Sequence, residues 1–241
     1  MTKKEYDDNN LKKRILDEMK TDSCVIKSRL PRETELADHM KVSRTQLRDA
    51  MANLEREGFI TRIHGNGTII NQHVMQVKNR MDIEMEFLEI IRSNGYQPGI
   101  SYVHVQEEKA DKFLADKLQI PEETEVMRVC RICTADGNPA IYCEDVFEKE
   151  LIKEEYTLDD FQAPIFNFLK KRCHIEAYMD LTQLHAVLAD EKVADAFGII
   201  VGSPLLNMEE IDYDISGNII FYSTQYFVDK YIEQTVLRKK L

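Results

Sequence analysis

The sequence predicts an α+β protein with two domains, an N-terminal group of helices ending in a β-hairpin and a C-terminal domain built on an antiparallel sheet. Three observations support this fold class. Apolar residues recur at helical spacing up to residue 58, an Asn-Gly hairpin signal lies at residues 66–67, and helical and strand-like segments alternate after residue 81. We expect the domains at residues 1–71 and 81–241, joined by a linker at residues 72–80.

The first domain should contain three helices before its hairpin. The first, at residues 10–20, has an apolar stripe of Leu11, Ile15, Leu16 and Met19. The second should end near Met40. For the third, Ser43 is a favourable N-cap, and Gln46 stands three positions later as in a capping box. The apolar face of the third helix consists of Leu47, Ala50, Met51 and Leu54.

The opposite face of the third helix carries Arg44, Thr45 and Arg48, since successive residues are about 100° apart. In the first turn of a recognition helix, arginine can pair with guanine and threonine can contact a thymine methyl. Free N–H groups of that turn can also hold a phosphate. The alternative is a set of ordinary solvated side chains. Gln46 could either contact a base or complete the capping box.

The hairpin follows at residues 60–70, with His64-Gly65-Asn66-Gly67 at its tip. Asn-Gly is a hairpin-turn dipeptide, and the flanking residues favour β structure. His64 is the bulkiest side chain of the tip, so the tip could enter a minor groove or follow a phosphate backbone. A plain exposed turn is the alternative. With the preceding helices, the hairpin predicts a winged helix-turn-helix.

The net charge of −11 divides unevenly along the chain. Residues 1–75 hold 14 Lys+Arg and 12 Asp+Glu, whereas the remainder holds 18 and 31. Only the first part could therefore contact DNA without repulsion. We find no run of eighteen or more apolar residues and no apolar leader, and the five cysteines are odd in number. We therefore expect a cytoplasmic protein without membrane contact.

The second domain should be one α+β unit. Helices are expected at residues 82–93, 110–118, 165–172 and 191–197. Strands are expected at residues 102–106, 125–134, 140–147, 177–188, 205–213 and 219–227. Asp136-Gly137 and Ser216-Gly217-Asn218 supply the turns of two hairpins.

Residues 30–70 resemble the N-terminal domain of GntR-type bacterial transcription regulators. The matching residues are Leu30, Pro31, Glu33, Glu35, Leu36, Ala37, Val42, Ser43, Arg44, Thr45, Arg48, Ala50, Leu54, Glu55, Glu57, Gly58, Gly65, Gly67 and Thr68. The resemblance implies major-groove contacts from the third helix and contacts from the wing. The residues expected to bind DNA are Arg32, Thr34, Ser43, Arg44, Thr45, Gln46, Arg48, His64, Gly65 and Asn66.

One position departs from that family. The family usually has arginine where this chain has Thr34, and Arg32 stands in the usual serine position. Either Arg32 takes over a phosphate contact, or the chain reads a different operator. A lost phosphate contact would flatten the salt dependence of DNA binding.

The rest of the chain resembles the effector-binding (UTRA) domain of the HutC branch of the same family, whose fold is shared with chorismate lyase. The matching segments are residues 136–139, 186–190, 202–206, 213–214 and 222–223. The resemblance implies a homodimer that binds a palindromic operator in double-stranded DNA and responds to a small-molecule effector. A repressor is the expected function.

The expected effector pocket departs from sugar-phosphate-sensing relatives. Those relatives hold the phosphate with two arginines spaced by one, where this chain has Arg131 and Cys133. Other polar positions are replaced by Phe166, Cys143, Phe221 and Phe227, so we expect a nucleoside-like or aromatic effector rather than a sugar phosphate. The alternative is that the phenylalanines are core and Arg131 pairs with a carboxylate. The expected ligand-binding residues are Phe87, Leu88, Arg131, Cys133, Cys143, Asp145, Phe166, Phe221, Ser223, Gln225 and Phe227.

No cofactor or metal is expected. Cys130 and Cys133 would point to opposite faces of a strand, whereas zinc ligands at that spacing usually lie on a turn. The rival function is a small-molecule enzyme like chorismate lyase. We identify no catalytic residues, because no Ser/His/Asp, Cys/His or paired-carboxylate arrangement is visible, and an enzyme would not need the DNA-reading segment.

Overall fold

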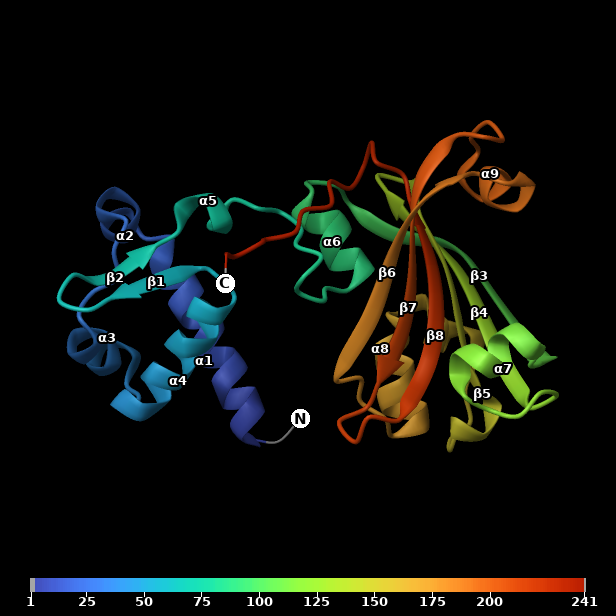
Figure 1. The fold of residues 1–241 in the computed structure, drawn as a ribbon, viewed down its shortest axis with the longest axis horizontal. Helices are drawn as coiled ribbons and strands as arrows, with labels where there is room; N and C mark the ends of the chain where they lie inside the picture. The colour runs from blue at the N-terminus through green and yellow to red at the C-terminus, as the bar shows by residue number, and fades with distance from the viewer. Residues whose placement is uncertain (1–2, 241) are drawn as a thin grey trace. The chain divides into compact units, whose positions relative to one another are not determined.

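The computed structural model of the chain describes residues 3–240 and the side chains of residues 10–240 (Figure 1). It contains two compact units. Unit 1 is the described chain up to Asp82 together with the segment from Thr235 onwards, and unit 2 is Ile83–Gln234. The α+β class predicted from the sequence is confirmed.

Unit 1 is mainly helical. Its elements are α1 (Lys3–Met19), α2 (Asp22–Lys27), α3 (Glu33–Met40), α4 (Arg44–Arg56), β1 (Ile60–Ile63), β2 (Gly67–Ile70) and α5 (Gln72–Met75). The apolar faces of α1, α3 and α4 form one core with both strands of the hairpin. Ile15, Leu47 and Leu54 are fully buried in it. The sequence prediction missed α2 and began α1 too late.

Two segments differ from the expected division of the chain. Residues 72–80, expected to be a linker, contain α5 and bury Val74, Asn79 and Arg80 within unit 1. The C-terminal segment was expected to belong to the second domain. Instead Thr235 forms a bridge to Arg80, and its carbonyl accepts from the backbone N–H of Met81 at 2.8 Å.

The C-terminal segment also reaches the end of α4. Lys239 Nζ donates to the backbone carbonyls of Glu55 at 2.5 Å and Arg56 at 2.8 Å. The last carbonyls of a helix lack partners within the helix, and a cation there opposes the negative end of the helix dipole. The C-terminal segment therefore caps α4, the helix expected to read DNA.

Unit 2 is a six-stranded antiparallel sheet with helices on both faces. Its strands are β3 (Pro98–Lys109), β4 (Glu125–Ala135), β5 (Asn138–Glu148), β6 (Met179–Leu188), β7 (Pro204–Tyr213) and β8 (Ile219–Phe227). They are ordered β3-β4-β5-β8-β7-β6, so β3 and β6 are the edges. The helical elements are α6 (Phe87–Ser93), α7 (Lys112–Leu118), η1 (Lys149–Leu151), η2 (Leu158–Gln162), α8 (Ile165–Phe168), η3 (Leu169–Cys173) and α9 (Glu191–Phe197).

Alternation along the strands divides the sheet into two faces. On one face, α7 and α9 pack against residues such as Val126, Val146 and Tyr142. On the other face, α8 and its neighbours pack against Val129, Phe147 and others. We call this second face the inner face. It also carries the side chains predicted to bind an effector.

Candidate functional site

The start of α4 is fixed by a capping box. Gln46 N donates to Ser43 Oγ at 3.2 Å, and Ser43 N donates to Gln46 Oε1 at 3.1 Å. Both orphan N–H groups are therefore satisfied by side chains. This geometry uses Gln46 for capping rather than for a free base contact. Arg44 and Thr45 are exposed in the turn that the cap holds in place.

Other predicted contacts surround this turn. Arg48 is exposed and donates from Nε to Glu33 Oε2 at 2.8 Å, which raises the pKa of Arg48. Arg32 is the exposed N-cap residue of α3, and Thr34 is exposed in the first turn of that helix. A phosphate near Arg48 would have to compete with Glu33 for the guanidinium.

The wing is a hairpin in which Ile63 lies opposite Gly67. Gly65 and Gly67 have φ of 74° and 79°, in the left-handed region that glycine tolerates best. His64, Gly65 and Asn66 are exposed. Arg29 Nη2 donates to Asn66 Oδ1 at 3.1 Å, and Nη1 donates to the Asn66 carbonyl. The predictions missed Arg29, which lies far from the wing in sequence.

On the inner face of unit 2, polar side chains cross neighbouring strands. Arg131 Nη2 donates to Asp145 Oδ2 at 2.7 Å, and each side chain is 2% exposed. Ser223 Oγ donates to the other oxygen of Asp145 at 2.8 Å. Gln225 Nε2 lies 3.3 Å from Ser223 Oγ and also donates to Glu210. We call these five residues the polar strip.

Pairing in the polar strip changes the expected role of Arg131. The side chain was expected to be available for an anionic or carbonyl group of an effector. In the structure Asp145 neutralises it, and Nη1 donates to the Ala163 carbonyl at 3.0 Å. This arrangement matches the alternative in which Arg131 pairs with a carboxylate. Asp145 favours the charged guanidinium and helps to raise the pKa of Arg131.

Aromatic side chains flank the polar strip. The rings of Phe87 and Phe227 meet edge to face at 6.2 Å between centroids, and those of Phe166 and Phe221 lie 5.8 Å apart. Phe227 lies opposite Ile141, and Phe221 lies opposite Asp212. The predicted ligand-binding residues that lie on strands therefore share the inner face, and Phe87 and Phe166 contact it from α6 and α8. The exception is Leu88 on α6, for which only partial burial is observed.

The cysteines of the inner face are buried thiols. Cys133 and Cys143 are 1% and 0% exposed. Burial raises the pKa of Cys133 to about 11 and the pKa of Cys143 well above its ordinary value. Both therefore behave as small apolar groups. Among the described residues, no group of three or more His, Cys, Asp or Glu is placed to hold a metal ion.

Three carboxyls, one in the polar strip and two near it, were missed by the sequence analysis. Burial raises the pKa of Glu86 to about 7, although Arg131 acts in the opposite direction. Burial and nearby carboxylates raise the pKa of Glu210 to about 7 and that of Asp212 to about 9. The alternation of Met208, Glu210 and Asp212 on β7 was the available signal, since residues two apart share a face.

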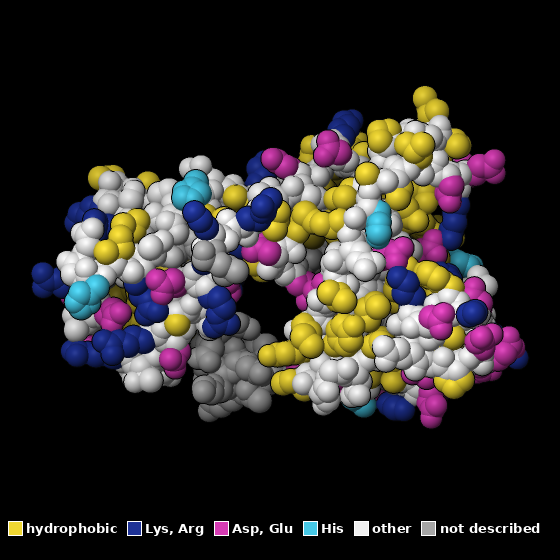
Figure 2. All heavy atoms as spheres, in the orientation of Figure 1, with side chains coloured by type: hydrophobic (Ala, Val, Ile, Leu, Met, Phe, Trp, Pro, Cys, Tyr) yellow, Lys and Arg dark blue, Asp and Glu magenta, His cyan; other side chains and the backbone are white. Residues whose placement is uncertain are grey.

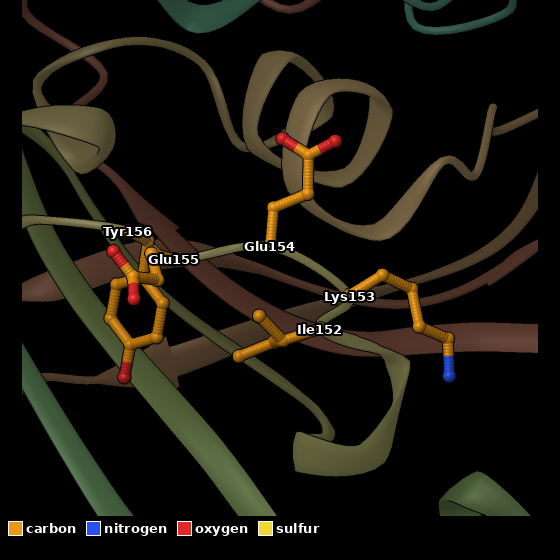
Figure 3. A pocket seen from close by; sticks show the side chains of 5 residues that line it. All are labelled: Ile152, Lys153, Glu154, Glu155 and Tyr156. Carbon is orange, nitrogen blue, oxygen red and sulfur yellow. The ribbon is translucent and has the colours of Figure 1, made fainter.

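A separate hollow lies on the surface beside η1. Its lining comes from one continuous segment, Ile152, Lys153, Glu154, Glu155 and Tyr156 (Figure 3). Figure 3 shows Lys153 and Glu154 pointing away from Tyr156 rather than toward a common centre. Ligand sites usually have convergent polar groups, so the inner face is the stronger candidate. Within the described chain, no helix is both long and apolar enough to span a bilayer.

Comparisons with known proteins agree with both parts of this geometry. A family model described as "Bacterial regulatory proteins, gntR family" matches residues 8–70, and the UTRA domain model matches residues 93–233. The HTH-type transcriptional repressor NagR of Bacillus subtilis is 25% identical over 203 residues, which cover 84% of this chain and 82% of NagR. A probable fructoselysine utilization operon transcriptional repressor of Escherichia coli K12 is 21% identical, with coverage of 95% and 93%.

Solved structures show the same fold. The possible transcriptional regulator YydK of Bacillus subtilis has a TM-score of 0.76 at 18% identity, covering 95% of this chain and 99% of YydK. These relatives are named as regulators, which disfavours the rival function of an enzyme like chorismate lyase. The UTRA match alone spans more than half of the chain. The chain therefore belongs to the GntR family of bacterial transcription regulators, with the winged helix-turn-helix and UTRA effector domain of its HutC branch.

Proposed function

We propose that this protein is a dimeric transcriptional repressor that binds a palindromic operator and is regulated by a small metabolite on the inner face of unit 2. The DNA-binding part of this proposal rests on the geometry at the start of α4. Its capping box holds Arg44 and Thr45 exposed in the first turn, where a recognition helix meets base edges. The exposed wing tip supplies a second contact. Repression is supported by the names of NagR and the fructoselysine operon repressor.

The edge strand β6 supports a homodimer. Leu181, Leu184 and Leu188 on this strand are 59%, 52% and 69% exposed. Figure 2 shows hydrophobic side chains gathered along this side of unit 2. Exposed apolar patches and unpaired strand edges commonly mark contacts with another chain. Two copies related by a twofold axis would present two α4 helices to the two halves of a palindrome.

The inner face supports an effector that is not a sugar phosphate. Arg131 is already neutralised by Asp145, and the flanking groups are aromatic. A phosphate would bring negative charge next to Asp145, Glu210 and Asp212, where the described side chains offer no free cation to receive it. We propose that the effector shifts a population between two arrangements of the dimer with different affinities for DNA. We therefore also propose a cytoplasmic location, where a regulator would meet its operator.

The test is binding of the purified full chain to labelled DNA from upstream of its own gene. We expect saturable binding that Arg44→Ala weakens by about tenfold or more, because a bidentate contact to guanine is worth about 1–3 kcal/mol. Arg56→Ala is the matched control, since Arg56 is exposed at the opposite end of the same helix. Equal loss in both variants, or no specific complex at moderate salt, would contradict the proposal.

Addition of metabolites to that complex tests the regulatory part. A compound that binds unit 2 and changes the DNA affinity supports it. Release of the protein by a sugar phosphate would refute the effector class proposed here.

A further inference from the structure

An excess of carboxyl groups meets on the inner face of unit 2. Four carboxylates act electrostatically on Asp212, namely Glu210, Glu84, Asp180 and Asp145. Glu84 and Asp145 likewise raise the pKa of Glu86, whereas Arg131 lowers it. Arg131 is the cation that faces this group, and Asp145 already pairs with it. The remaining carboxyls therefore have no matching positive charge in this part of the described chain.

The register of the sheet forces these groups together. Asp180 lies directly opposite Asp212, and Glu210 lies opposite Ser223, which lies opposite Asp145 on its other side. Like charges placed directly opposite each other on neighbouring strands destabilise a sheet. These acids come from β5, β7 and β6, with Ser223 of β8 between them, and they cannot all ionise without cost unless a positive charge joins them.

A buried atom within the row lacks a partner. Asp212 is 1% exposed, and its Oδ2 has no hydrogen bond. Buried polar atoms are normally paired, so this oxygen marks a missing partner. Arg131 Nε, in a side chain that is 2% exposed, also has no hydrogen bond. Glu84, before α6, is exposed and acts electrostatically on Asp212.

The surroundings indicate what kind of cation fits. The described carboxyls are not grouped as ligands of a metal ion. Phe221 lies opposite Asp212 and contacts Phe166, so an apolar wall adjoins the acids. Aromatic faces attract organic cations as well as apolar groups.

We propose that the effector is a small organic amine, with its protonated nitrogen at Asp212 and Glu210 and its apolar body against Phe221 and Phe166. This inference rests on the proposed function, because it names the effector of the same inner face. In this proposal, carboxyl groups of the protein bind an ammonium group of the effector, whereas sugar-phosphate-sensing relatives bind a phosphate group with arginines.

Binding of such a ligand should release protons. Asp212, with a pKa of about 9, holds its proton at pH 7, and Glu210, with a pKa of about 7, holds part of one. An ammonium group beside them favours the carboxylate, so the carboxyl O–H proton passes to the buffer and the oxygen accepts an N–H. The charged and titratable groups that face this position are Glu84, Glu86, Arg131, Cys133, Cys143, Asp145, Asp180 and Glu210. From β8, Phe221, Ser223 and Gln225 face it without titrating.

Calorimetry on the full chain tests the proposal. The probes are butylamine, putrescine, phenethylamine and tryptamine, each beside an uncharged alcohol of similar shape. We expect at least one amine to bind tenfold or more tightly than its alcohol. Titration at pH 7 in phosphate and in MOPS, which differ in ionisation enthalpy and contain no primary amine, should show net proton release. If no amine exceeds its alcohol, or binding takes up protons, the proposal is overturned.

Variants locate the site. Asp212→Asn keeps the shape of the side chain and should weaken amine binding by tenfold or more and reduce the proton release. Glu210→Gln is a second test, should Asp212→Asn fail to fold. Glu209→Gln is the matched control, because Glu209 lies on the same strand, faces the other way and pairs with Lys117 at 2.6 Å. Unchanged amine affinity in both inner-face variants would overturn the assignment.

The DNA complex separates this inference from the proposed function. Specific DNA binding with no amine binding would overturn the amine and leave the repressor intact. Amine binding without any specific DNA complex would overturn the repressor, while the calorimetric result would still stand. Amine binding that leaves the affinity for DNA unchanged would show that the amine is not the effector.

Discussion

Two arginine–carboxylate pairs of nearly equal length have opposite environments. In unit 1, Arg48 and Glu33 lie 2.8 Å apart, with side chains 66% and 31% exposed. In unit 2, Arg131 and Asp145 lie 2.7 Å apart, each 2% exposed. Water screens the first pair, so Arg48 can leave Glu33 for a phosphate at little cost. Neither member of the second pair can lose its partner without leaving a buried charge.

The largest expected effect is on the buried pair. Arg131→Met should lower the free energy of unfolding of unit 2 by about 3–5 kcal/mol, because it leaves Asp145 as an unpaired buried charge. Chemical denaturation of the full chain, followed by a probe in unit 2, measures this. Loss of less than about 1 kcal/mol, the range of exposed pairs, would remove the contrast between the two pairs.

A smaller effect on the free energy of unfolding of unit 2 should come from a rise in pH. The folded chain holds the Asp212 proton up to a pKa of about 9, whereas an unfolded aspartate loses it near pH 4. The folded state therefore binds more protons between these values, and its stability falls as pH rises through that window. The slope is about 1.4 kcal/mol per pH unit for one proton, so unit 2 should lose about 3 kcal/mol from pH 6 to pH 8.

Denaturation of the full chain at several pH values checks this slope. Asp212→Asn should remove the share of one proton and leave the part of the slope that Glu86 and Glu210 contribute, and Glu209→Gln should leave the slope unchanged. A stability that rises across the same window would show that Asp212 is ionised in the folded protein.

The cap of α4 should matter less for folding than either change. Ser43→Ala removes the side-chain acceptor of Gln46 N and should cost about 1 kcal/mol of unit 1 stability. Ser43→Asp should restore most of it, because aspartate is an equally good N-cap. Thermal unfolding monitored in unit 1 compares the variants. An alanine variant as stable as the parent would show that the capping box does not hold the start of α4.

The smallest effect on folding should come from the exposed pair. Arg48→Ala should leave the melting temperature of unit 1 unchanged, since both partners stay hydrated. It should reduce the slope of log affinity for DNA against log salt by about 0.9, the value for one phosphate contact. Glu33→Gln should keep that slope, because Arg48 remains. An unchanged slope in Arg48→Ala would mean that Arg48 does not contact DNA.

Sequence reasoning succeeded where the determinants are local. The Ser43–Gln46 box and the turn at Gly65 and Gly67 each lie within a few residues, so spacing alone predicts their geometry. Most strands of unit 2 were also recovered, because alternation marks a face. The end of α8 was less well predicted, since the turn at Leu169–Cys173 is a π-helix that periodicity does not reveal.

The parts that could not be predicted depend on contacts between distant residues. Asp180 and Asp212 become neighbours only through the pairing of β6 with β7. The sequence left open whether Arg131 would bind an effector or pair with a carboxylate, and the pairing of β4 with β5 brings Asp145 to it. Arg29 is likewise placed against Asn66 by the packing of the chain before α3. Period-two alternation could have identified Glu210 and Asp212 as sharing a face, but not that the face is buried.

The return of the C-terminal segment to unit 1 bears on how the chain is made. A ribosome completes residues 3–82 long before it adds Thr235 and Lys239, which bridge Arg80 and cap α4. During synthesis of unit 2, the carbonyls of Glu55 and Arg56 at the end of α4 therefore lack the ammonium group of Lys239, although the N–H of Gly58 donates to the Glu55 carbonyl. The backbone N–H groups of Glu57, Gly58 and Phe59 already donate to carbonyls at the end of α4, so the late segment adds a positive charge to a helix end that can form without it.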